Sequence, residues 1–226
     1  MSEVLTFSDS DRNAPAIHRL IQDYFHDGRR IDIAVAGEDD MYAYSEHFCG
    51  GRPIGAMAYF RAGLTIYDCV SVIVKWRFGG FGSVKSFLDF AGGHGRFTRF
   101  LKSAMPEDRI WMAEILPDAV RFQKQQFGVQ ALQSATHPDE FACKEKFDVV
   151  FVSSLFTHLP DRTFTPWLKR LFELLTPGGL LIFSVHAERM LPHNTPMPER
   201  ALHSRDRSAL SGCRRLWCDS RQSRLR

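Results

Sequence analysis

The sequence predicts an α/β protein with a three-layer, doubly wound and mostly parallel sheet. The first observation is that short apolar segments alternate with segments of helical periodicity from about residue 84 onward. Such alternation is typical of parallel strands, which need crossover helices on both faces of the sheet. The second is that 226 residues, 44% of them hydrophobic, suffice for one sizeable core.

The strands of this sheet are predicted at five places, each bounded by turn residues. They are residues 86–90, 109–115, 129–132, 147–153 and 180–185. Helices are predicted between them at 96–105, 117–127 and 165–175. The last helix has Thr165 as its expected N-cap and Pro166 as its first residue. Its buried stripe is expected to comprise Leu168, Leu171, Phe172 and Leu175.

Residues 1–83 predict an N-terminal helical cover over this core. One helix is expected within residues 14–26, where apolar side chains recur at helical spacing, and Gly28 follows as a stop. Residues 37–53 are predicted to be rich in loops. A longer helix is expected from about residue 54 to 78, with Gly63 as a candidate break point.

The basic charge of the chain is concentrated at its C-terminal end. Residues 188–226 hold nine arginines against four acidic residues, a net charge of +5, whereas residues 1–187 carry −2 of the total of +3. No alternating apolar run is present there, so this segment is predicted to be an irregular basic tail that does not join the sheet. It is typical of a truncated or frame-shifted longer protein, or of a basic interaction tail.

If the tail stays outside the sheet, the fifth strand becomes an exposed edge. Leu181, Phe183 and Val185 would then lack part of their cover, which favours self-association through this edge. Nucleic acid is an unfavoured partner, because the body is mildly acidic and no aromatic residues interleave with the basic charges.

The sequence also shapes expectations about location and metal binding. The longest apolar candidate, Cys69 to Val74, is closed by Lys75, so no membrane span is expected. No secretory signal is visible at the N-terminus, and a cytoplasmic location is expected. The five cysteines form no C-x-x-C pair, which argues against a zinc site or a disulfide framework.

The most informative segment follows the first predicted strand of the sheet. Asp89 ends that strand, small residues fill the turn from Ala91 to Gly95, and a helix follows at once. Glycines let a ligand approach the backbone, and a helix N-terminus offers unpaired N–H groups. A dinucleotide fingerprint would need a third glycine at position 98, where Thr98 stands. Glu114 ends the second strand and can accept hydrogen bonds from both hydroxyls of a ribose.

These motifs resemble those of the class I S-adenosylmethionine-dependent methyltransferases. The first motif of that family, Asp/Glu-x-Gly-x-Gly-x-Gly, is matched by Asp89, Ala91, Gly93 and Gly95, with Ala91 in place of the first glycine. The resemblance continues through Glu114, through residues 147–160 and through the turn at 175–183. Upstream, Tyr59 and Gly63 are similar to the helix that often covers the cofactor in this family.

The resemblance implies a Rossmann-like core at residues 84–187 that binds S-adenosylmethionine. By that analogy, Gly93 and Gly95 bring backbone against the methionine end, Asp89 fixes the loop and the amino group, and Glu114 holds the ribose. Ser134, or the backbone of Ala135, would serve the adenine in place of the family's aspartate. The list of cofactor-binding residues that the resemblance implies is Asp89, Ala91, Gly93, Gly95, Glu114, Ser134 and Ser153.

The implied activity is transfer of a methyl group to a small-molecule nucleophile. A dedicated base is optional for this chemistry, and the sequence names no catalytic residue; His158 is more readily interpreted as a packing residue than as a base. Two alternatives stay open: a binding module that keeps the fold without catalysis, and an NAD(P)-dependent Rossmann oxidoreductase.

Overall fold

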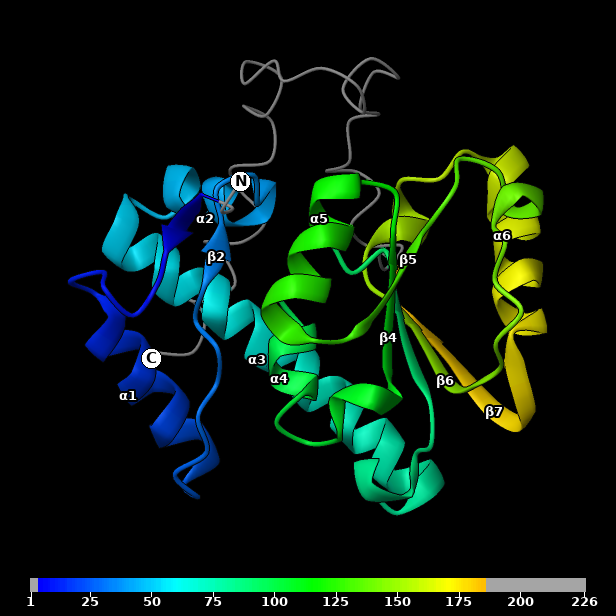
Figure 1. Cartoon of the computed structure of the whole chain (residues 1–226), viewed down its shortest axis with the longest axis horizontal. Helices are drawn as coiled ribbons and strands as arrows, with labels where there is room; N and C mark the ends of the chain where they lie inside the picture. The colour runs from blue at the N-terminus through cyan, green and yellow to red at the C-terminus, as the bar shows by residue number, and fades with distance from the viewer. Residues whose placement is uncertain (1–3, 186–226) are drawn as a thin grey trace, which may run out of the picture. The chain divides into compact units, whose positions relative to one another are not determined.

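The centre of the structure is a five-stranded parallel sheet (Figure 1). The structure is a computed structural model and describes residues 4–185. In chain order the strands are β3 (Phe87–Phe90), β4 (Ile110–Glu114), β5 (Gln130–Gln133), β6 (Phe147–Val152) and β7 (Leu175–Phe183). The five predicted strands and the predicted doubly wound, parallel architecture are confirmed, except that β7 begins at Leu175, five residues before its predicted start, and ends at Phe183.

The strand order β5-β4-β3-β6-β7 places β3 at the middle of the sheet. The chain runs outward from β3 through β4 to β5, and then crosses to the other side of β3 to form β6 and β7. The direction of winding therefore reverses beside β3. Ligands of doubly wound sheets bind at this point, outside the carboxyl ends of the strands.

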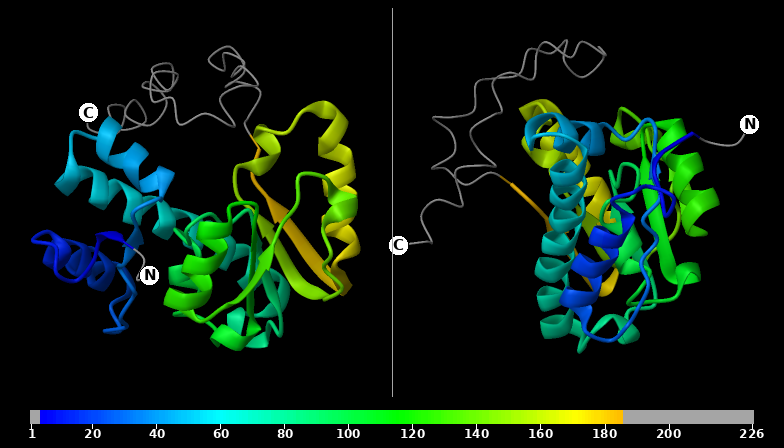
Figure 2. Two further views of the ribbon diagram at one scale, coloured as in Figure 1. Left: turned by 45° about the horizontal axis from the view of Figure 1, so that its top comes forward. Right: turned by 90° about the vertical axis from the view of Figure 1, so that its left-hand side faces the viewer.

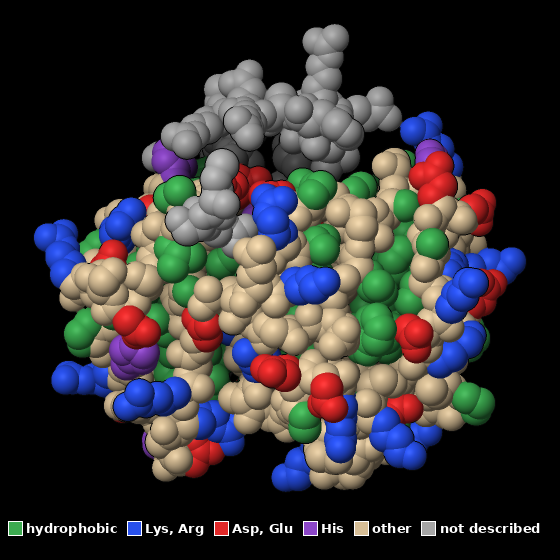
Figure 3. All heavy atoms as spheres, in the orientation of Figure 1, with side chains coloured by type: hydrophobic (Ala, Val, Ile, Leu, Met, Phe, Trp, Pro, Cys, Tyr) green, Lys and Arg blue, Asp and Glu red, His purple; other side chains and the backbone are tan. Residues whose placement is uncertain are grey.

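Alternation along the strands divides the core into two hydrophobic clusters. Leu88 and Phe90 point to one face of the sheet and belong to one cluster, whereas Phe87 points to the other face and belongs to the other. The face of Phe87 is covered by α3, α4 and α5, and the opposite face by α6 and the segment 134–146 (Figures 1 and 2). Hydrophobic side chains gather between β5 and α6 (Figure 3).

The core has three α-helices within the described residues. The α-helices are α4 (Thr98–Leu101), α5 (Pro117–Phe122) and α6 (Asp161–Glu173), and a π-helical turn, η3 (Gln123–Phe127), continues α5. The 3₁₀ turns are η1 (Phe81–Ser83), η2 (Glu107–Arg109), η4 (Pro138–Glu140) and η5 (Leu155–Thr157).

The cover contains more structure than the sequence predicted. Besides α1 (Ala14–Phe25), it has a two-stranded antiparallel sheet of β1 (Leu5–Phe7) and β2 (Val35–Ala36), which was not predicted. The expected loop at 37–53 is wrong, because it contains α2 (Asp40–Phe48). Asp39 caps this helix by accepting hydrogen bonds from the N–H groups of Met41 and Tyr42.

The long helix α3 (Arg52–Phe78) is continuous, so the expected break at Gly63 is wrong. A Cβ at Gly63 would lie 2.4 Å from the Arg96 carbonyl and 2.5 Å from the ring of Phe100. Gly63 therefore permits close packing of α3 against the core. Figure 2 shows α3 extending from the cover into the layer beside the sheet.

By length and composition alone, α3 qualifies as a candidate membrane span. Core helices of water-soluble proteins pass the same test, and ten of the 27 residues of α3 are buried in the fold.

Two predicted helices of the core have other bounds. The expected helix 96–105 is reduced to α4, because i→i+3 hydrogen bonds and the Ser103 hydroxyl, which donates to the Phe100 carbonyl, tighten the chain after Leu101. Helix α6 begins at Asp161 rather than at Thr165, with Pro166 inside it. Of its expected buried stripe, Leu171 is buried as predicted and Leu168 and Leu175 are partly buried, whereas Phe172 is 67% exposed. The buried residues are Trp167, Leu171 and Leu174.

The described residues form one compact unit in which cover and core share a hydrophobic cluster. Strand β7 pairs with β6 alone in the described part of the chain, and Phe183 and Val185 at its end are 39% and 56% exposed. The prediction that residues 188–226 form an irregular tail outside the sheet falls beyond the described residues.

Candidate functional site

Asp89 lies at the carboxyl end of β3, beneath the turn formed by residues 91–97. Its side chain is fully buried and accepts a hydrogen bond of 2.7 Å from the Thr98 hydroxyl. Burial raises the pKa of Asp89 to about 7, an effect to which the Glu114 carboxylate adds and which the Thr98 hydrogen bond opposes. Thr98, which breaks the dinucleotide fingerprint, thus acts as a hydrogen-bond donor to the first acid of the motif.

Glu114 lies at the carboxyl end of β4, the strand next to β3, and is also buried. Its Oε2 accepts a hydrogen bond of 2.9 Å from the Gly93 N–H, and its Oε1 accepts one of 2.7 Å from the Ile115 N–H. The carboxylate therefore joins the glycine-rich loop to the end of β4. The structure brings the two predicted acids, Asp89 and Glu114, to one edge of the sheet.

The two predicted glycines, Gly93 and Gly95, differ in their surroundings. Both have positive φ, 54° and 80°. A Cβ at Gly93 would meet no atom within 4 Å, so this position faces open space. A Cβ at Gly95 would lie 2.4 Å from the ring of Phe127 and 3.1 Å from Gln123. Gly93 is free to face a ligand, whereas Gly95 allows the loop to pack on the end of the α5–η3 segment.

Ala91 is one of three described non-glycine residues with positive φ, at 58°. Its N–H donates to the Ala113 carbonyl of β4 at 2.8 Å. A left-handed conformation is costly for a residue with a Cβ. Alanine thus stands at a position whose backbone suits glycine, the residue that the family's motif has there.

Ser134 and Ser153 lie at the same edge, directly after β5 and β6 respectively. The Ser134 N–H donates to the Glu114 carbonyl at 2.8 Å, which holds it beside the end of β4. The Ser153 carbonyl accepts from the Leu155 N–H at 2.7 Å within its own turn. The structure therefore gathers all the predicted site residues at the carboxyl ends of β3, β4, β5 and β6; their roles toward a ligand stay predictions.

Sequence reasoning missed several residues that shape this site. Gln123 is fully buried and donates to the Gly93 carbonyl at 2.7 Å, and Arg99 donates to the Gly95 carbonyl at 3.1 Å. Ile115 and Leu116, which follow Glu114, are 48% and 43% exposed and offer an apolar surface beside its carboxylate. Of these residues, only Ile115 and Leu116 could have been found from the sequence, as an apolar pair that follows an acid. The contacts of Gln123 and Arg99 depend on tertiary packing.

The remaining residues that the sequence singled out have other surroundings. Tyr59 is buried and donates to Asp39 at 2.6 Å, so its hydroxyl is engaged within the cover. His94 is buried against Phe122, with its Nε2 3.3 Å from an oxygen of Asp118. His158 is exposed in the turn that follows β6.

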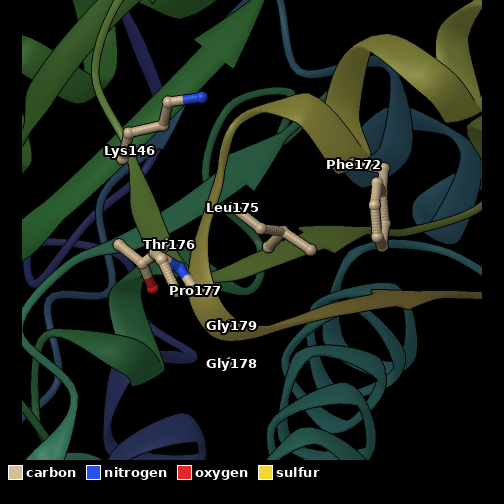
Figure 4. A pocket seen from close by; sticks show the side chains of 7 residues that line it. All are labelled: Lys146, Phe172, Leu175, Thr176, Pro177, Gly178 and Gly179. Carbon is tan, nitrogen blue, oxygen red and sulfur yellow. The ribbon is translucent and has the colours of Figure 1, made fainter.

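A pocket of about 460 Å³ lies at the opposite edge of the sheet, at the amino end of β7 (Figure 4). It is lined by Lys146, Phe172, Leu175, Thr176, Pro177, Gly178 and Gly179. The Lys146 ammonium donates to the Glu173 carbonyl at the end of α6. This pocket contains none of the predicted site residues. Residues 4–185 contain no cluster of side chains suited to holding a metal ion.

Comparison with known proteins gives one match at the level of sequence families. Residues 88–181, which run from β3 into β7, match a family described as a methyltransferase domain. No curated protein matches the chain.

Several solved structures are similar to this chain at low identity. One is an S-adenosylmethionine-dependent methyltransferase from Clostridium acetobutylicum, with 14% identity over 57% of this chain and 52% of that chain, at a TM-score of 0.44. DesVI from Streptomyces venezuelae has 20% identity over 64% of this chain and 55% of that chain, at a TM-score of 0.45. The N-methyltransferase NodS from Bradyrhizobium japonicum, solved with S-adenosyl-L-homocysteine, has 20% identity over 64% of this chain and 72% of that chain, at a TM-score of 0.45.

The chain spans about half the length of the first two of these structures. Similarity at this level concerns the fold, which the strand order of the sheet already establishes.

Proposed function

We propose that this chain, whose residues 88–181 belong to the class I S-adenosylmethionine-dependent methyltransferase family, transfers a methyl group to a small-molecule nucleophile. The family that the sequence predicted is confirmed by the family match, and the Rossmann-like fold by the topology of the sheet. The cofactor of this family is S-adenosylmethionine. The acceptor and the activity of the chain are part of the proposal.

The observation that carries the proposal is the open space at Gly93 in the glycine-rich loop. This residue has a left-handed backbone and open space where a side chain would be, next to the buried Glu114 carboxylate and above Asp89. One buried polar atom beside the same loop, Gln123 Oε1, has no hydrogen-bond partner among the described residues. The residues present therefore fit a ligand with several polar groups that lies against this loop.

Each residue of the site has a part in holding the cofactor. Glu114 would accept hydrogen bonds from the ribose hydroxyls, and Ile115 and Leu116 would contact the adenine ring with their exposed apolar side chains. Asp89 keeps the loop in place through the hydrogen bond that it accepts from Thr98, and its carboxyl would accept a hydrogen bond from the amino group of the cofactor. Ser134 and Ser153 lie at the neighbouring strand ends, where they would line the adenine and methyl-donor sides.

The bound cofactor supplies an already activated methyl group on its sulfonium. The protein therefore has to orient the acceptor and exclude water, and no residue of this chain is assigned as a base. A small-molecule acceptor is favoured because residues 1–187 carry a net charge of −2, which does not suit a polyanionic substrate.

The test is calorimetric titration of the full chain with S-adenosylmethionine, S-adenosylhomocysteine, NADH and NADPH. Binding of the first two alone supports the proposal, and binding of a nicotinamide cofactor alone supports an oxidoreductase. A screen of small-molecule acceptors with methyl-labelled cofactor then separates an enzyme from a binding module. Cofactor binding without label transfer to any acceptor in the screen would favour the binding module.

Two further proposals concern assembly and location. The open β7 edge, with Phe183 and Val185 exposed beside it, supports self-association through this strand. Sedimentation velocity of the full chain, compared with a Phe183→Lys variant, tests it: the variant should lower the fraction of dimer. A cytoplasmic location is proposed as well, and fractionation of cells that express the tagged chain tests it.

A further inference from the structure

Arg99 of α4 is among the largest fully buried side chains of the described residues, with 1% exposure. In the described part of the chain no carboxylate lies within ion-pair distance of its guanidinium. Its positive charge is instead surrounded by carbonyl oxygens and by the faces of aromatic rings. The ring centroids of Tyr59, Phe60 and Phe127 lie between 5.2 and 5.5 Å from its Cζ.

One side of the guanidinium holds the glycine-rich loop. Arg99 Nε donates to the Gly95 carbonyl at 3.1 Å, at the point where the loop turns into α4. Gly95 cannot move toward the α5–η3 segment, because the ring of Phe127 occupies the space beside its Cα. Arg99 and Phe127 thus fix the position of Gly95 from two directions.

The other side of the guanidinium holds the N-terminal cover. Arg99 Nη1 donates to the carbonyls of Asp32 and Ala34, at 3.1 and 2.9 Å, and Nη2 donates to the Tyr59 hydroxyl at 3.4 Å. The Tyr59 hydroxyl in turn donates to Asp39, the N-cap of α2. One side chain therefore joins the loop of the site to residues 65 and 67 positions earlier in the chain.

We infer that Arg99 is a positioning residue that couples the packing of cover residues 31–36 to the shape of the glycine-rich loop, and thereby to cofactor affinity. The inference rests on the proposed function. A guanidinium is a planar fork whose donors have fixed directions, so its bonds to Gly95 and to Ala34 form together only when loop and cover are both in place. Ordering of one part then favours ordering of the other, and such coupling is reciprocal.

A lysine at this position would keep the positive charge but would lose the planar set of N–H donors of the guanidinium. Its single ammonium cannot reach the Gly95 and Ala34 carbonyls in the directions that the guanidinium serves. Arg99→Lys therefore shows whether the positive charge alone suffices or whether the simultaneous hydrogen bonds to Gly95 and Ala34 are needed. Gln126→Ala is a matched control, because Gln126 donates to the Asp32 side chain at 2.7 Å and is not bonded to the glycine-rich loop.

The experiment is hydrogen exchange by mass spectrometry on the full chain, with and without saturating S-adenosylhomocysteine, together with calorimetric affinities. In the wild type the ligand should slow exchange at residues 31–36 about fivefold or more, the lower end of the usual range for coupled sites. Gln126→Ala should retain this effect. Arg99→Lys and Arg99→Gln should lose it, and their affinity should fall by the same factor as the lost protection.

Each outcome decides between the proposals. Ligand binding to the wild type without slower exchange at residues 31–36 overturns the inference and leaves the proposed function intact. Coupling in Arg99→Lys equal to that of the wild type also overturns it, because the charge alone would then suffice. If the wild type does not bind S-adenosylhomocysteine, the proposed function fails, and the inference with it. Should Arg99→Gln not fold, Arg99→Lys decides alone.

Discussion

The loops after β3 and after β6 lie on the two sides of the point where the winding of the sheet reverses, yet they are held in different ways. The loop of residues 91–97 is fixed by two side chains from distant elements, Glu114 and Gln123, and by Arg99 of the helix that follows it. The loop of residues 153–160 is held mainly by bonds between near neighbours, such as that from the Thr157 N–H to the Ser154 carbonyl. A hydrogen bond that the Ser154 N–H donates to the Ser184 hydroxyl joins its backbone to a distant residue.

The difference indicates that the first loop serves the cofactor and the second loop serves the acceptor. A loop that is fixed before the ligand arrives loses little entropy on binding, which suits a cofactor that is the same in every turnover. A loop held by local contacts can adapt to an acceptor. Substitutions in the first loop should therefore alter cofactor affinity and stability strongly, and those in the second loop weakly.

The largest effect is expected from Gly93→Val, which should weaken S-adenosylhomocysteine binding by more than about a hundredfold, because a branched side chain would fill the open space at the loop. Calorimetry measures this loss. Gly79→Val is the matched control, since Gly79 also has positive φ and open space but lies at the end of α3. Equal affinity of Gly93→Val and the control would move the ligand away from this loop.

The second effect concerns how the free energy of unfolding depends on pH through Asp89, which lies beneath the first loop. Unfolded Asp89 loses its proton near pH 3.8 and folded Asp89 near pH 7, so the folded state binds the extra proton between these values. The free energy of unfolding should therefore fall as the pH rises from 4 to 7, by at most roughly 4 kcal/mol. Asp89→Asn cannot ionise and should lack this fall. Urea denaturation of both proteins at pH 5 and pH 8 measures the difference; equal pH dependence would contradict the buried, protonated carboxyl.

The third effect is on the ribose contact. Glu114→Ala should weaken S-adenosylhomocysteine binding by roughly 1.5–3 kcal/mol, the scale for hydrogen bonds to a charged group. It also removes the acceptor of the Gly93 N–H, so the loop should exchange its amide hydrogens faster. Ser153→Ala, in the other loop, serves as the comparison and should change the affinity by less than about 0.5 kcal/mol. Equal losses in the two variants would remove the contrast between the loops.

The sequence predicted the positions of the strands and of the acids that end them, because these depend on local patterns. The five strands, Asp89 and Glu114 follow from apolar runs and turn residues alone. The helix α2 was missed, since its signal is a single aspartate cap, Asp39, in a segment rich in glycine. Arg99 and Gln123 were missed for a different reason: their partners lie about thirty and sixty-five positions away, and only the packed fold brings these groups together.

Gly95 illustrates the same limit inside a motif that was recognised. The family resemblance implied that Gly93 and Gly95 alike face the cofactor, and only the ring of Phe127 distinguishes them. Gly95→Ala should lower the free energy of unfolding by about 1–3 kcal/mol through overpacking. Adding Phe127→Leu should recover part of this loss, and chemical denaturation of the single and double variants measures it. Additive losses would show that the ring does not set the constraint.

The smallest effect is expected at a backbone feature that both loops share, a non-glycine residue with positive φ. Ala91 and Ser154 both have positive φ, 58° and 62°, without being glycine. Replacing either by glycine relieves the left-handed strain but gives the unfolded chain more conformational freedom, so each variant should be more stable by only roughly 0.5 kcal/mol.

In the first loop the distant contacts keep the backbone in place, so Ala91→Gly should leave the affinity for S-adenosylhomocysteine within about twofold of the wild type. In the second loop most of the restraining bonds are local, so Ser154→Gly should speed amide exchange at residues 153–158, while Ala91→Gly should not do so at 91–97. Hydrogen exchange of the two variants measures this contrast, and faster exchange around Ala91→Gly would show that the first loop is held no more firmly than the second.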